Sequence, residues 1–297
     1  MRILNIGSIN IDHVYAVDHF VRPGETLASA RYAVFAGGKG FNQSIALARA
    51  GAVTRHAGMV GRDAAWLLER LTREGIDVSH LKTTDLATGH AVIQVVPSGE
   101  NAIVLHGGAN LAVSAELVTQ AVSACSKGDC LLLQNETSST AEAIRSGKRH
   151  GLRVVFNPAP MSPVVQDYPL QDVDLFILNE TEAEGLTGHT TPAGVRTTMI
   201  AKFPRSATVL TMGKDGAVFF DSARMLRQPG FVVTPVDTTA AGDTFIGFFL
   251  AELMRSNDPA QALRLGCRAA AICVTRPGAA ESIPLLQEVL TAQEAKA

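Results

Sequence analysis

Residues 236–250 read Val-Asp-Thr-Thr-Ala-Ala-Gly-Asp-Thr-Phe-Ile-Gly-Phe-Phe-Leu and join a predicted strand to a predicted helix. The apolar residues at 231–236 ahead of this stretch predict a strand, and the apolar spacing at 245–253 predicts a helix with one buried face. Between the two, residues 240–242 are Ala, Ala and Gly, which have almost no side chain. Several backbone N–H groups at the helix start are therefore free to face one bound group, so the stretch predicts an anion-binding turn.

Two carboxylates lie at the ends of this turn, Asp237 before it and Asp243 after it. An acidic residue is favoured at the start of a helix, and Asp243 has the position of an ordinary helix cap. A carboxylate beside an anion site also has a chemical use, because it is placed to take a proton from a reacting group. This stretch alone is compatible with both roles of Asp243.

Length and composition predict a single domain over residues 1–297. The chain has 46% hydrophobic and 18% charged residues, which suits a large buried core. The formal net charge is −2, and Lys and Arg form no long run. Nucleic acids and anionic membrane surfaces are therefore not expected partners.

The start of the chain and the cysteines indicate a cellular compartment. Asn and Ser interrupt residues 1–8 too early for the apolar region of a signal peptide. No stretch approaches the roughly 18 uninterrupted apolar residues of a membrane span. The four cysteines include no C-x-x-C pair and lie in apolar patterns, so we expect buried thiols in a cytoplasmic protein.

Strand and helix patterns alternate along most of the chain, which is typical of an α/β fold with a mostly parallel sheet. Strands are predicted at 2–6, 53–60, 130–134, 153–156, 175–178, 208–212 and 217–220. Helices are predicted to run up to Gly51 and to span 63–74, 114–124, 138–150, 192–203 and 259–274. In the helix at 63–74, Trp66 is expected to point inward with Leu67 and Leu71.

Polar or acidic residues follow three successive predicted strands, at 135–137, at Asn157 and at 179–182. The carboxyl ends of parallel strands share one edge of the sheet, where ligands bind in such folds. Ordinary capping of the next helices explains each case singly but explains the set less well. Asn10 and Asp12 follow the first strand and share one side of an extended chain, where an amide and a carboxylate suit sugar hydroxyls.

The Gly-rich turn at 37–40 opens a helix and lets a ligand approach the backbone closely. It is neither a Walker A loop nor the G-x-G-x-x-G dinucleotide fingerprint. Further along, the β-rich runs at 90–96 and 101–105, joined by Pro-Ser-Gly-Glu, predict a hairpin. With the strand at 30–35, this hairpin is expected to form a small separate sheet, a lid over the site whose apolar face suits a dimer contact.

Four motifs occur in order along the chain, with Asn-Ile-Asp at 10–12 ahead of them. They are Gly-Gly-Lys-Gly-Phe-Asn at 37–42, Asn-Glu-Thr-Glu at 179–182, Thr-Met-Gly-Lys-Asp-Gly at 211–216 and Asp-Thr-Thr-Ala-Ala-Gly-Asp at 237–243. Together they resemble the signatures of the ribokinase or PfkB family of carbohydrate kinases. The resemblance runs over residues 3–284, nearly the whole chain.

The resemblance implies a doubly wound, mostly parallel sheet flanked by helices, with a small β lid formed by strands from about 13–36 and 88–107. The implied reaction is ATP-dependent phosphorylation of a sugar primary hydroxyl, for ribose at O5. Asp243 then resembles the general base, and the backbone N–H groups of Ala240, Ala241, Gly242 and Asp243 resemble the anion hole for the transferred phosphoryl group. A homodimer joined through the lid is also expected.

The family pattern further assigns positions for the sugar, the nucleotide and two cations. The sugar positions are Asn10, Asp12, Gly38, Lys39, Asn42, Glu136 and Asp243. The nucleotide positions are Asn179, Thr211, Gly213, Gly216, Gly242 and Cys267. The position for Mg²⁺, held indirectly, is Glu182, and the positions of the K⁺ loop are Asp237, Thr239, Cys273, Arg276, Gly278 and Ser282.

The sequence departs from the family pattern at a few positions and is compatible with other functions. Phe41 is bulkier than the small residue expected after the Gly-rich turn, and Pro277 and Glu281 change side chains of the K⁺ loop. The alternatives are a sibling kinase acting on deoxyribose, a nucleoside or a sugar phosphate, and a sugar-binding protein without catalysis. A nicotinamide dehydrogenase is disfavoured, because its Gly fingerprint is missing.

Overall fold

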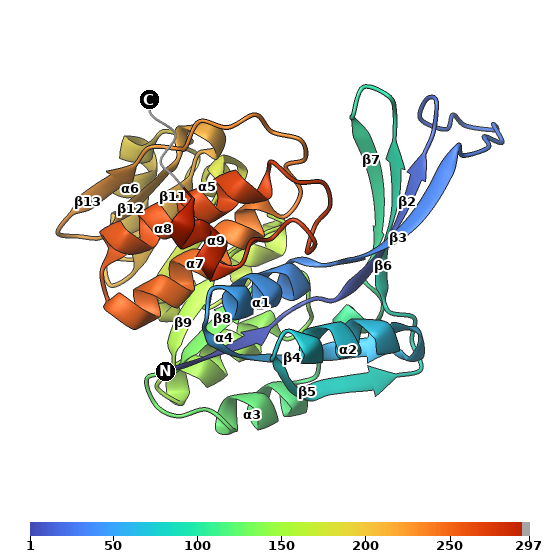
Figure 1. The fold of residues 1–297 in the computed structure, drawn as a ribbon. Coiled ribbons are helices and arrows are strands. Elements are labelled where there is room, and N and C mark those ends of the chain that lie inside the picture. Colours follow the sequence, from blue (N-terminus) through green and yellow to red (C-terminus); the bar gives the residue numbers. More distant parts are fainter. Residues whose placement is uncertain (293–297) are drawn as a thin grey trace.

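The computed structural model describes residues 1–292, which fold into a large sheet between helices and a smaller sheet projecting from it (Figure 1). The strand order is β13-β12-β11-β10-β9-β8-β1-β4-β5 in the large sheet and β3-β2-β6-β7 in the small one. The large sheet contains β1 (Arg2–Ile6), β4 (Val53–Gly61), β5 (Asp77–Thr84), β8 (Cys130–Leu133), β9 (Arg153–Phe156), β10 (Leu175–Leu178), β11 (Ala207–Thr211), β12 (Ala217–Phe220) and β13 (Met225–Gln228). The small sheet contains β2 (Asn10–Ala16), β3 (Arg31–Gly37), β6 (Gly89–Val95) and β7 (Asn101–His106).

The central strands are short apolar runs buried on both faces, as the sequence predicts for a parallel sheet. All four residues of β8 and of β10 are buried. In the large sheet, the neighbouring strands in the order β11-β10-β9-β8-β1-β4-β5 all pair in parallel. β12 and β13 add an antiparallel edge beside β11. The predicted doubly wound, mostly parallel sheet is confirmed.

The direction of winding changes beside β1. From β1 the chain first adds β4 and β5 on one side and then returns to place β8 to β11 on the other. A crevice opens outside the carboxyl ends of the strands at such a switch point, because the connections leave in opposite directions. The residues that follow β1 and β8 therefore meet there.

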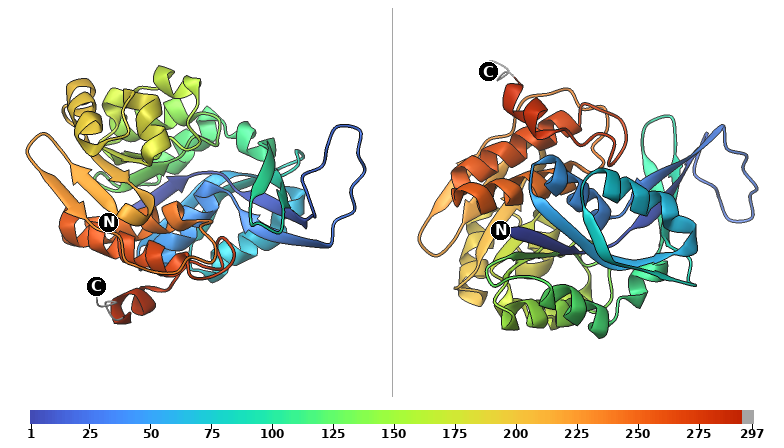
Figure 2. Two further views of the ribbon diagram at one scale, coloured as in Figure 1. Left: turned by 90° about the horizontal axis from the view of Figure 1, so that it is seen from above. Right: turned by 60° about the horizontal axis from the view of Figure 1, so that its bottom comes forward.

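Two layers of helices cover the large sheet (Figure 2). One apolar cluster joins α3 to α6 to one face, and two further clusters join α1, α2, α7 and α8 to the other. The helices are α1 (Lys39–Arg49), α2 (Ala65–Arg73), α3 (Ala115–Ser123), α4 (Thr140–Arg149), α5 (Glu180–Thr187), α6 (Pro192–Lys202), α7 (Ala241–Ser256), α8 (Pro259–Cys273) and α9 (Leu286–Thr291).

Helices α1 and α7 pack closely because Gly247 has no side chain. A Cβ atom at Gly247 would lie 2.3 Å from Cβ of Ala46 and 2.7 Å from the α1 backbone. Contacts this short do not occur between real side chains, so only glycine permits this approach of the two helices. The close packing brings the first turns of both helices to the same crevice.

The small sheet confirms the predicted lid hairpin and its third strand. β6 and β7 pair in antiparallel fashion, and β2 pairs with β3 and β6. The lid begins earlier than expected, because β2 starts at Asn10 rather than near residue 13. Asn10 and Asp12 thus lie on one face of a strand, as their spacing predicts.

Several local predictions are wrong. Residues 231–236 form no strand; Val232 is 84% exposed there, and the backbone N–H of Val236 donates instead to the carbonyl of Val274 at 2.7 Å. An apolar run forms a strand only where a neighbouring strand offers partners, and this segment crosses the surface between β13 and α7. Trp66 is 37% exposed rather than inward. β5 and β13 were not predicted, because their alternating burial gives a weaker apolar signal than a fully buried strand.

The sequence predicts no membrane span and four buried thiols. None of the helices within residues 1–292 combines the length and apolar character that a membrane span needs. All four cysteines are free thiols; Cys130, Cys267 and Cys273 are buried, whereas Cys125 is only half-buried.

Candidate active site

The first turn of α7 forms the centre of the site. Ala240 precedes it in the left-handed region, at φ 60°, a conformation that costs a residue with a side chain about 1–2 kcal/mol. The first N–H groups of any helix lack partners within the helix. That of Ala241 donates to the carbonyl of Thr238 at 3.3 Å, so those of Gly242 and Asp243 are left to serve a bound anion. These residues line a cavity of about 250 Å³ at the carboxyl ends of the strands.

Two amides from the start of α1 hold the carboxylate of Asp243. Nδ2 of Asn42 donates to Oδ2 at 3.1 Å, and Nε2 of Gln43 donates to Oδ1 at 2.9 Å. Asp243 is only 8% exposed, and its burial raises the pKa of the carboxyl, against the opposing influence of the Lys39 charge and the two amides. Asp243 is not the N-cap of α7, which is Ala240, and its carboxylate is held by the two amides of α1 instead.

Lys39 is the first residue of α1 and lies between acidic groups. Its predecessor Gly38 has φ 91°, which lets the chain turn sharply from β3 into the helix. Burial by itself lowers the pKa of the Lys39 ammonium, but the charges of Asp243, Glu136 and Glu182 outweigh burial and raise it. Lys39 lines the same cavity as Asp243 and Glu182, so its charge lies on the predicted phosphate side of the site as well as on the predicted sugar side.

The predicted sugar side gathers polar groups from the ends of β1 and β8. Oε2 of Glu136 accepts hydrogen bonds from the Ser8 hydroxyl and from the backbone N–H of Lys39, the latter at 3.0 Å. Burial raises the pKa of Asp12 to about 6, with the charge of Glu136 adding to the rise. Nδ2 of Asn110 donates to Oδ1 of Asn10 at 2.7 Å, which leaves the Asn10 nitrogen to donate to a ligand.

Phe41 lies in the same helix start but points away from the sugar side. Its ring is fully buried in the apolar cluster of α1 and α2, with the guanidinium of Arg70 5.9 Å from the ring centroid. The extra bulk of Phe41 therefore fills the core and leaves the polar face of α1 unchanged.

The predicted phosphate side is built on the start of α5. Asn179 and Glu182 form a reciprocal capping box, in which each side chain bonds the other residue's backbone N–H, at 2.9 and 2.8 Å. Burial raises the pKa of Glu182, against the opposing Asn179 N–H, the Lys39 charge and Asn157. Asn179, Glu182 and Thr211 line the cavity with Asp243 and Gly242, so the structure brings these predicted residues together.

The predicted nucleotide turn lies beside the cavity, whereas Cys267 lies in the apolar core. Gly213 and Gly216, both with positive φ, shape the short turn between β11 and β12, beside the cavity that Thr211 lines. Cys267 is buried on α8 in the apolar cluster that contains Phe245 and Phe249. Its thiol therefore packs in the core beneath this side of the site.

Two segments predicted to form the K⁺ loop meet behind the anion turn. Oδ1 of Asp237 accepts from the N–H of Thr239 at 2.9 Å, and Oδ2 accepts from the N–H of Gly278 at 3.0 Å. Sγ of Cys273 lies 3.0 Å from Oγ of Ser282 and 3.8 Å from the carbonyl of Thr239. Only the side chain of Arg276 turns away, to pair with Glu288 at 2.5 Å.

Sequence reasoning assigned no role to four buried residues that support the site, namely Ser8, Gln43, Asn110 and Asn157. Each contacts an assigned residue, and Asn157 joins Gln43 to Glu182. A polar residue close to the carboxyl end of a strand was a signal for Asn157, which directly follows β9, and for Ser8, two positions after β1. Nothing in the local pattern of Gln43 or Asn110 distinguishes them from exposed amides.

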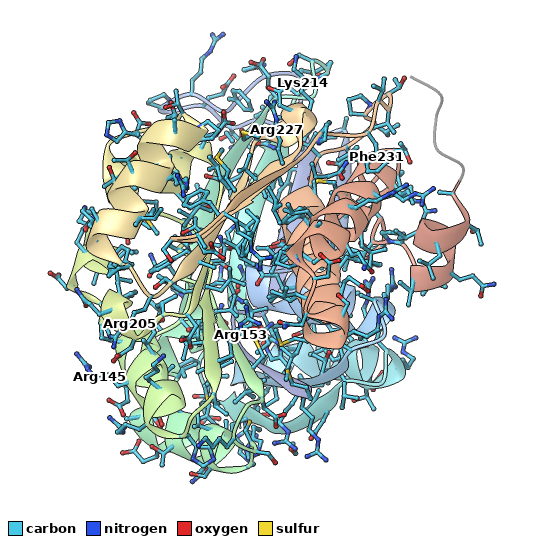
Figure 3. All side chains as sticks on the ribbon, turned by 90° about the vertical axis from the view of Figure 1, so that its left-hand side faces the viewer. Arg145, Arg153, Arg205, Lys214, Arg227 and Phe231 are labelled. Atoms are coloured by element: carbon cyan, nitrogen blue, oxygen red, sulfur yellow. The ribbon has the colours of Figure 1, made fainter. Side chains whose placement is uncertain are left out.

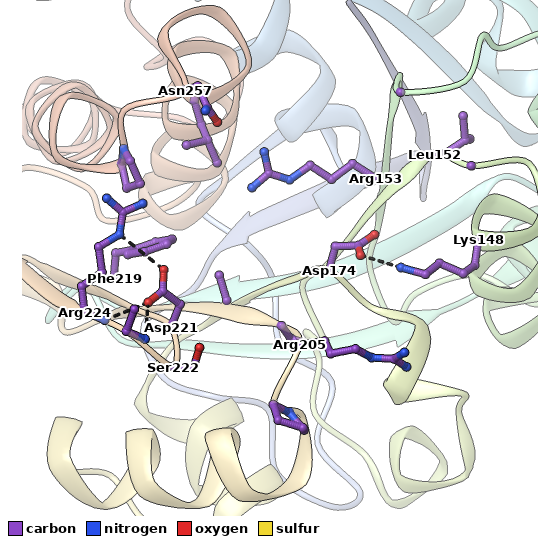
Figure 4. Close-up of a pocket in the computed structure, with 18 residues that line it drawn as sticks. Lys148, Leu152, Arg153, Asp174, Arg205, Phe219, Asp221, Ser222, Arg224 and Asn257 are labelled. Carbon is purple, nitrogen blue, oxygen red and sulfur yellow. Dashed lines mark hydrogen bonds and ion pairs between the residues drawn. The ribbon is translucent and has the colours of Figure 1, made fainter.

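A larger hollow of about 680 Å³ lies at the opposite, amino ends of β9 to β11 (Figure 4). Figure 3 shows these opposite ends, with Lys214 following β11 at one and Arg153 starting β9 at the other. In the hollow, Asp174 pairs with Lys148 at 2.6 Å and Asp221 with Arg224 at 3.3 Å. Its acidic groups are thus paired internally, and none of the sequence motifs reaches it.

Comparison with known proteins agrees with this geometry. The model of the pfkB family of carbohydrate kinases matches residues 2–286. The chain belongs to this family. It is therefore an enzyme of the carbohydrate kinase class, and the site at the switch point is where the family's motifs converge.

Relatives in the family are similar over nearly their whole length. Ribokinase of Haemophilus influenzae is 40% identical over 294 residues, covering 96% of each chain. The crystal structure of ribokinase from Cryptococcus neoformans in complex with ADP matches with a TM-score of 0.84 and 34% identity, covering 97% of this chain and 98% of that one. Arabidopsis thaliana ribokinase complexed with ribose and ATP matches with a TM-score of 0.85 and 26% identity, covering 97% of each chain.

Proposed function

We propose that this carbohydrate kinase transfers the γ-phosphoryl group of ATP to the O5 hydroxyl of D-ribose, giving D-ribose 5-phosphate and ADP. The observation that carries the proposal is the arrangement of Asn42 and Asp243. Within the described residues, Oδ1 of Asn42 is buried and has no hydrogen-bond partner, while its Nδ2 donates to Asp243. A buried acceptor without a partner is costly, so Oδ1 is suited to accept from a sugar hydroxyl beside the carboxylate.

Asp243 acts as the general base in this proposal. It takes the hydroxyl proton as the sugar oxygen attacks the γ-phosphorus, and the N–H groups of Ala240 to Asp243 stabilise the negative charge of the transferred group. Phosphoryl transfer depends on alignment and charge stabilisation more than on covalent help, and a helix start beside a buried base supplies both. Lys39, placed between the two acids of the cavity, adds positive charge on the phosphate side.

Asn10, Asp12, Gly38, Lys39, Asn42 and Glu136 are proposed to hold the sugar, and Asn179, Thr211, Gly213, Gly216 and Gly242 to hold the nucleotide, with the buried Cys267 supporting that side from the core. The free nitrogen of Asn10 suits a hydroxyl at the 2 position, which favours ribose over deoxyribose. The ribose and ATP in the Arabidopsis relative and the ADP in the Cryptococcus relative support these ligands. Use of ATP also supports the expectation that the protein works in the cytoplasm.

Two cations complete the proposal. Within residues 1–292 no three or more His, Cys, Asp or Glu side chains are arranged as a metal cage, but Mg²⁺ held largely by phosphates and water needs none. Glu182, a buried carboxylate lining the cavity, would hold its water shell. K⁺ would lie in the loop of Asp237, Thr239, Cys273, Arg276, Gly278 and Ser282, where it would fix the anion turn, with Arg276 contributing through its backbone.

The lid is proposed to join two copies of the chain. By strand register, Tyr32, Val34, Val92 and Val104 share one face of the lid, where these large apolar side chains stay exposed. Patches of this kind mark interaction surfaces. A second lid of the same chemistry would cover them, which supports the expected homodimer.

A second candidate substrate is a nucleoside. A cavity of about 290 Å³, lined by Leu105, Val164 and Tyr168, begins beside Asn10 and Glu136 at the far end of the sugar side from Asp243. A group attached to the sugar at that end would fit there. Coupled ADP detection with ribose, deoxyribose, inosine and hexose phosphates decides between these substrates, and turnover of ribose far below another would refute the ribose proposal.

The replacement Asp243→Asn tests the catalytic role. We expect a loss of about 10²- to 10⁴-fold or more in kcat with ribose binding largely kept, because the amide cannot accept the proton. Asp85→Asn, at an exposed ion pair far from the cavity, is the control and should keep full activity. A variant Asp243→Asn with half the original kcat would refute the base assignment.

A further inference from the structure

The amide of Gln43 uses all of its hydrogen-bonding groups beside the proposed base. Its Nε2 donates to Oδ1 of Asp243 at 2.9 Å and to Oδ1 of Asn157 at 3.4 Å. Its Oε1 accepts from Nε2 of Gln134 at 2.7 Å. The side chain is fully buried, so water does not compete for these contacts.

The direction of this amide is fixed from one side by a backbone carbonyl. The carbonyl of Gly40 can only accept, so the group of Asn5 that contacts it at 2.8 Å is Nδ2. Oδ1 of Asn5 then faces Gln134 and accepts from its Nε2 at 2.9 Å. The same Nε2 donates to Gln43, which leaves the Gln43 nitrogen pointing to Asp243.

A second backbone carbonyl fixes the other side. Nδ2 of Asn157 donates to the carbonyl of Ile177 at 2.9 Å and to Oε2 of Glu182 at 3.2 Å. Oδ1 of Asn157 therefore faces Gln43 and accepts from it. A continuous buried line of amides thus connects the carboxylate of Asp243 with that of Glu182.

We propose that Gln43 is a positioning residue that holds Asp243 in line with the sugar hydroxyl and couples it, through Asn157, to Glu182 on the phosphate side. This inference rests on the proposed role of Asp243 as the base. A donor to the ionised carboxylate favours the charged form and opposes the effect of burial. The charged and titratable groups around Asp243 are Lys39 from α1, Glu136 after β8, Glu182 from α5 and Cys273 from α8.

The test replaces the amide by an apolar side chain of similar length, Gln43→Met. Loss of one hydrogen bond to a charged group predicts a fall in kcat of about 10- to 100-fold, with KM for ribose changed by less than about 3-fold. The acid limb of the kcat–pH profile should move up by about one pH unit, because Asp243 loses a donor to its charged form. Gln120→Met on the exposed face of α3 is the matched control and should behave as the unmodified enzyme.

A purely structural role would lower kcat equally at every pH. An unmoved acid limb in Gln43→Met therefore overturns the proposal. If Gln43→Met does not fold, the variant Gln134→Met is used instead. Loss of the Gln134 donor frees the Gln43 amide to turn, so the acid limb should move in the same direction by a smaller amount. An unmoved acid limb in Gln134→Met again overturns the proposal. Full activity of Asp243→Asn would refute the base itself, whereas an inactive Asp243→Asn with an unaffected Gln43→Met would refute only the role of Gln43.

Discussion

The site floor, formed by the starts of α1 and α7 and the ends of β1, β8 and β9, differs sharply from the lid of β2, β3, β6 and β7. In the floor, Asp243, Gln43 and Asn157 are buried and connected to one another by hydrogen bonds. In the lid, Val104 is 69% exposed and several other large apolar side chains are also uncovered. Contacts within the chain thus fix the side chains of the floor, whereas several apolar side chains of the lid can be buried only against another surface.

The largest expected effect concerns the close packing that creates the floor. Gly247→Ala places Cβ against Ala46 at 2.3 Å and should lower the free energy of unfolding by about 1–3 kcal/mol, with a loss of kcat because Asn42 and Gln43 move away from Asp243. Urea unfolding and steady-state kinetics measure both effects.

The matched control is Gly242→Ala in the same helix. A Cβ atom at Gly242 meets nothing within 4 Å, so this change should leave stability unchanged or raise it by up to about 1 kcal/mol. Equal stability of the two variants would contradict the view that helix packing defines the floor.

The next effect concerns pH. Burial lowers the pKa of His56, which bonds Ser44 in the floor, to about 4. The unfolded chain takes up a proton at His56 near pH 6.5 and the folded chain does not, so stability falls as the pH drops from about 6.5 towards 4. At pH 5.5 this loss amounts to about 1.4 kcal/mol relative to pH 8.

Urea unfolding of the original protein and of His56→Gln at both pH values measures this contribution. The variant should lack this pH-dependent loss of stability, whatever its free energy of unfolding at pH 8. An identical pH dependence in both proteins would show that His56 does not titrate in this way.

A smaller effect is expected for Ala240→Gly at the anion turn. Glycine removes the cost of the left-handed conformation, which is about 1–2 kcal/mol. It also gives the unfolded chain more conformational freedom, which lowers stability by about 0.4–1 kcal/mol. We therefore expect a gain of about 0.5 kcal/mol in stability by urea unfolding. A clear loss would mean that contacts of the Ala240 methyl group, rather than the backbone, hold the turn.

The smallest effect on stability is expected in the lid. Val104→Ser removes an exposed methyl pair and should change the free energy of unfolding of the monomer by less than about 0.5 kcal/mol. Sedimentation should nevertheless show weaker self-association, if the lid joins two copies. A loss of several kcal/mol in dilute solution would show that the lid is as well packed as the floor, which would remove the contrast between the two regions.

Much of the fold was predictable because local patterns agreed with it. The bounds of β1, β9, β10 and β12 match the predicted strands, since each is a short apolar run buried on both faces. The predicted turn at 240–242 and Asp243 line the cavity at the carboxyl ends of the strands. The predicted strand at 231–236 failed because its pattern has no partner strand in the folded chain.

Spacing and residue type sufficed to predict the α/β class, the family motifs and the acid at the start of α7. The groups that surround this acid follow from the packing of distant segments. Gln43 and Asp243 lie 200 positions apart, and their contact depends on Gly247 letting α1 and α7 approach. A buried hydrogen-bond network is formed by packing between distant segments, so no local pattern in the sequence records it.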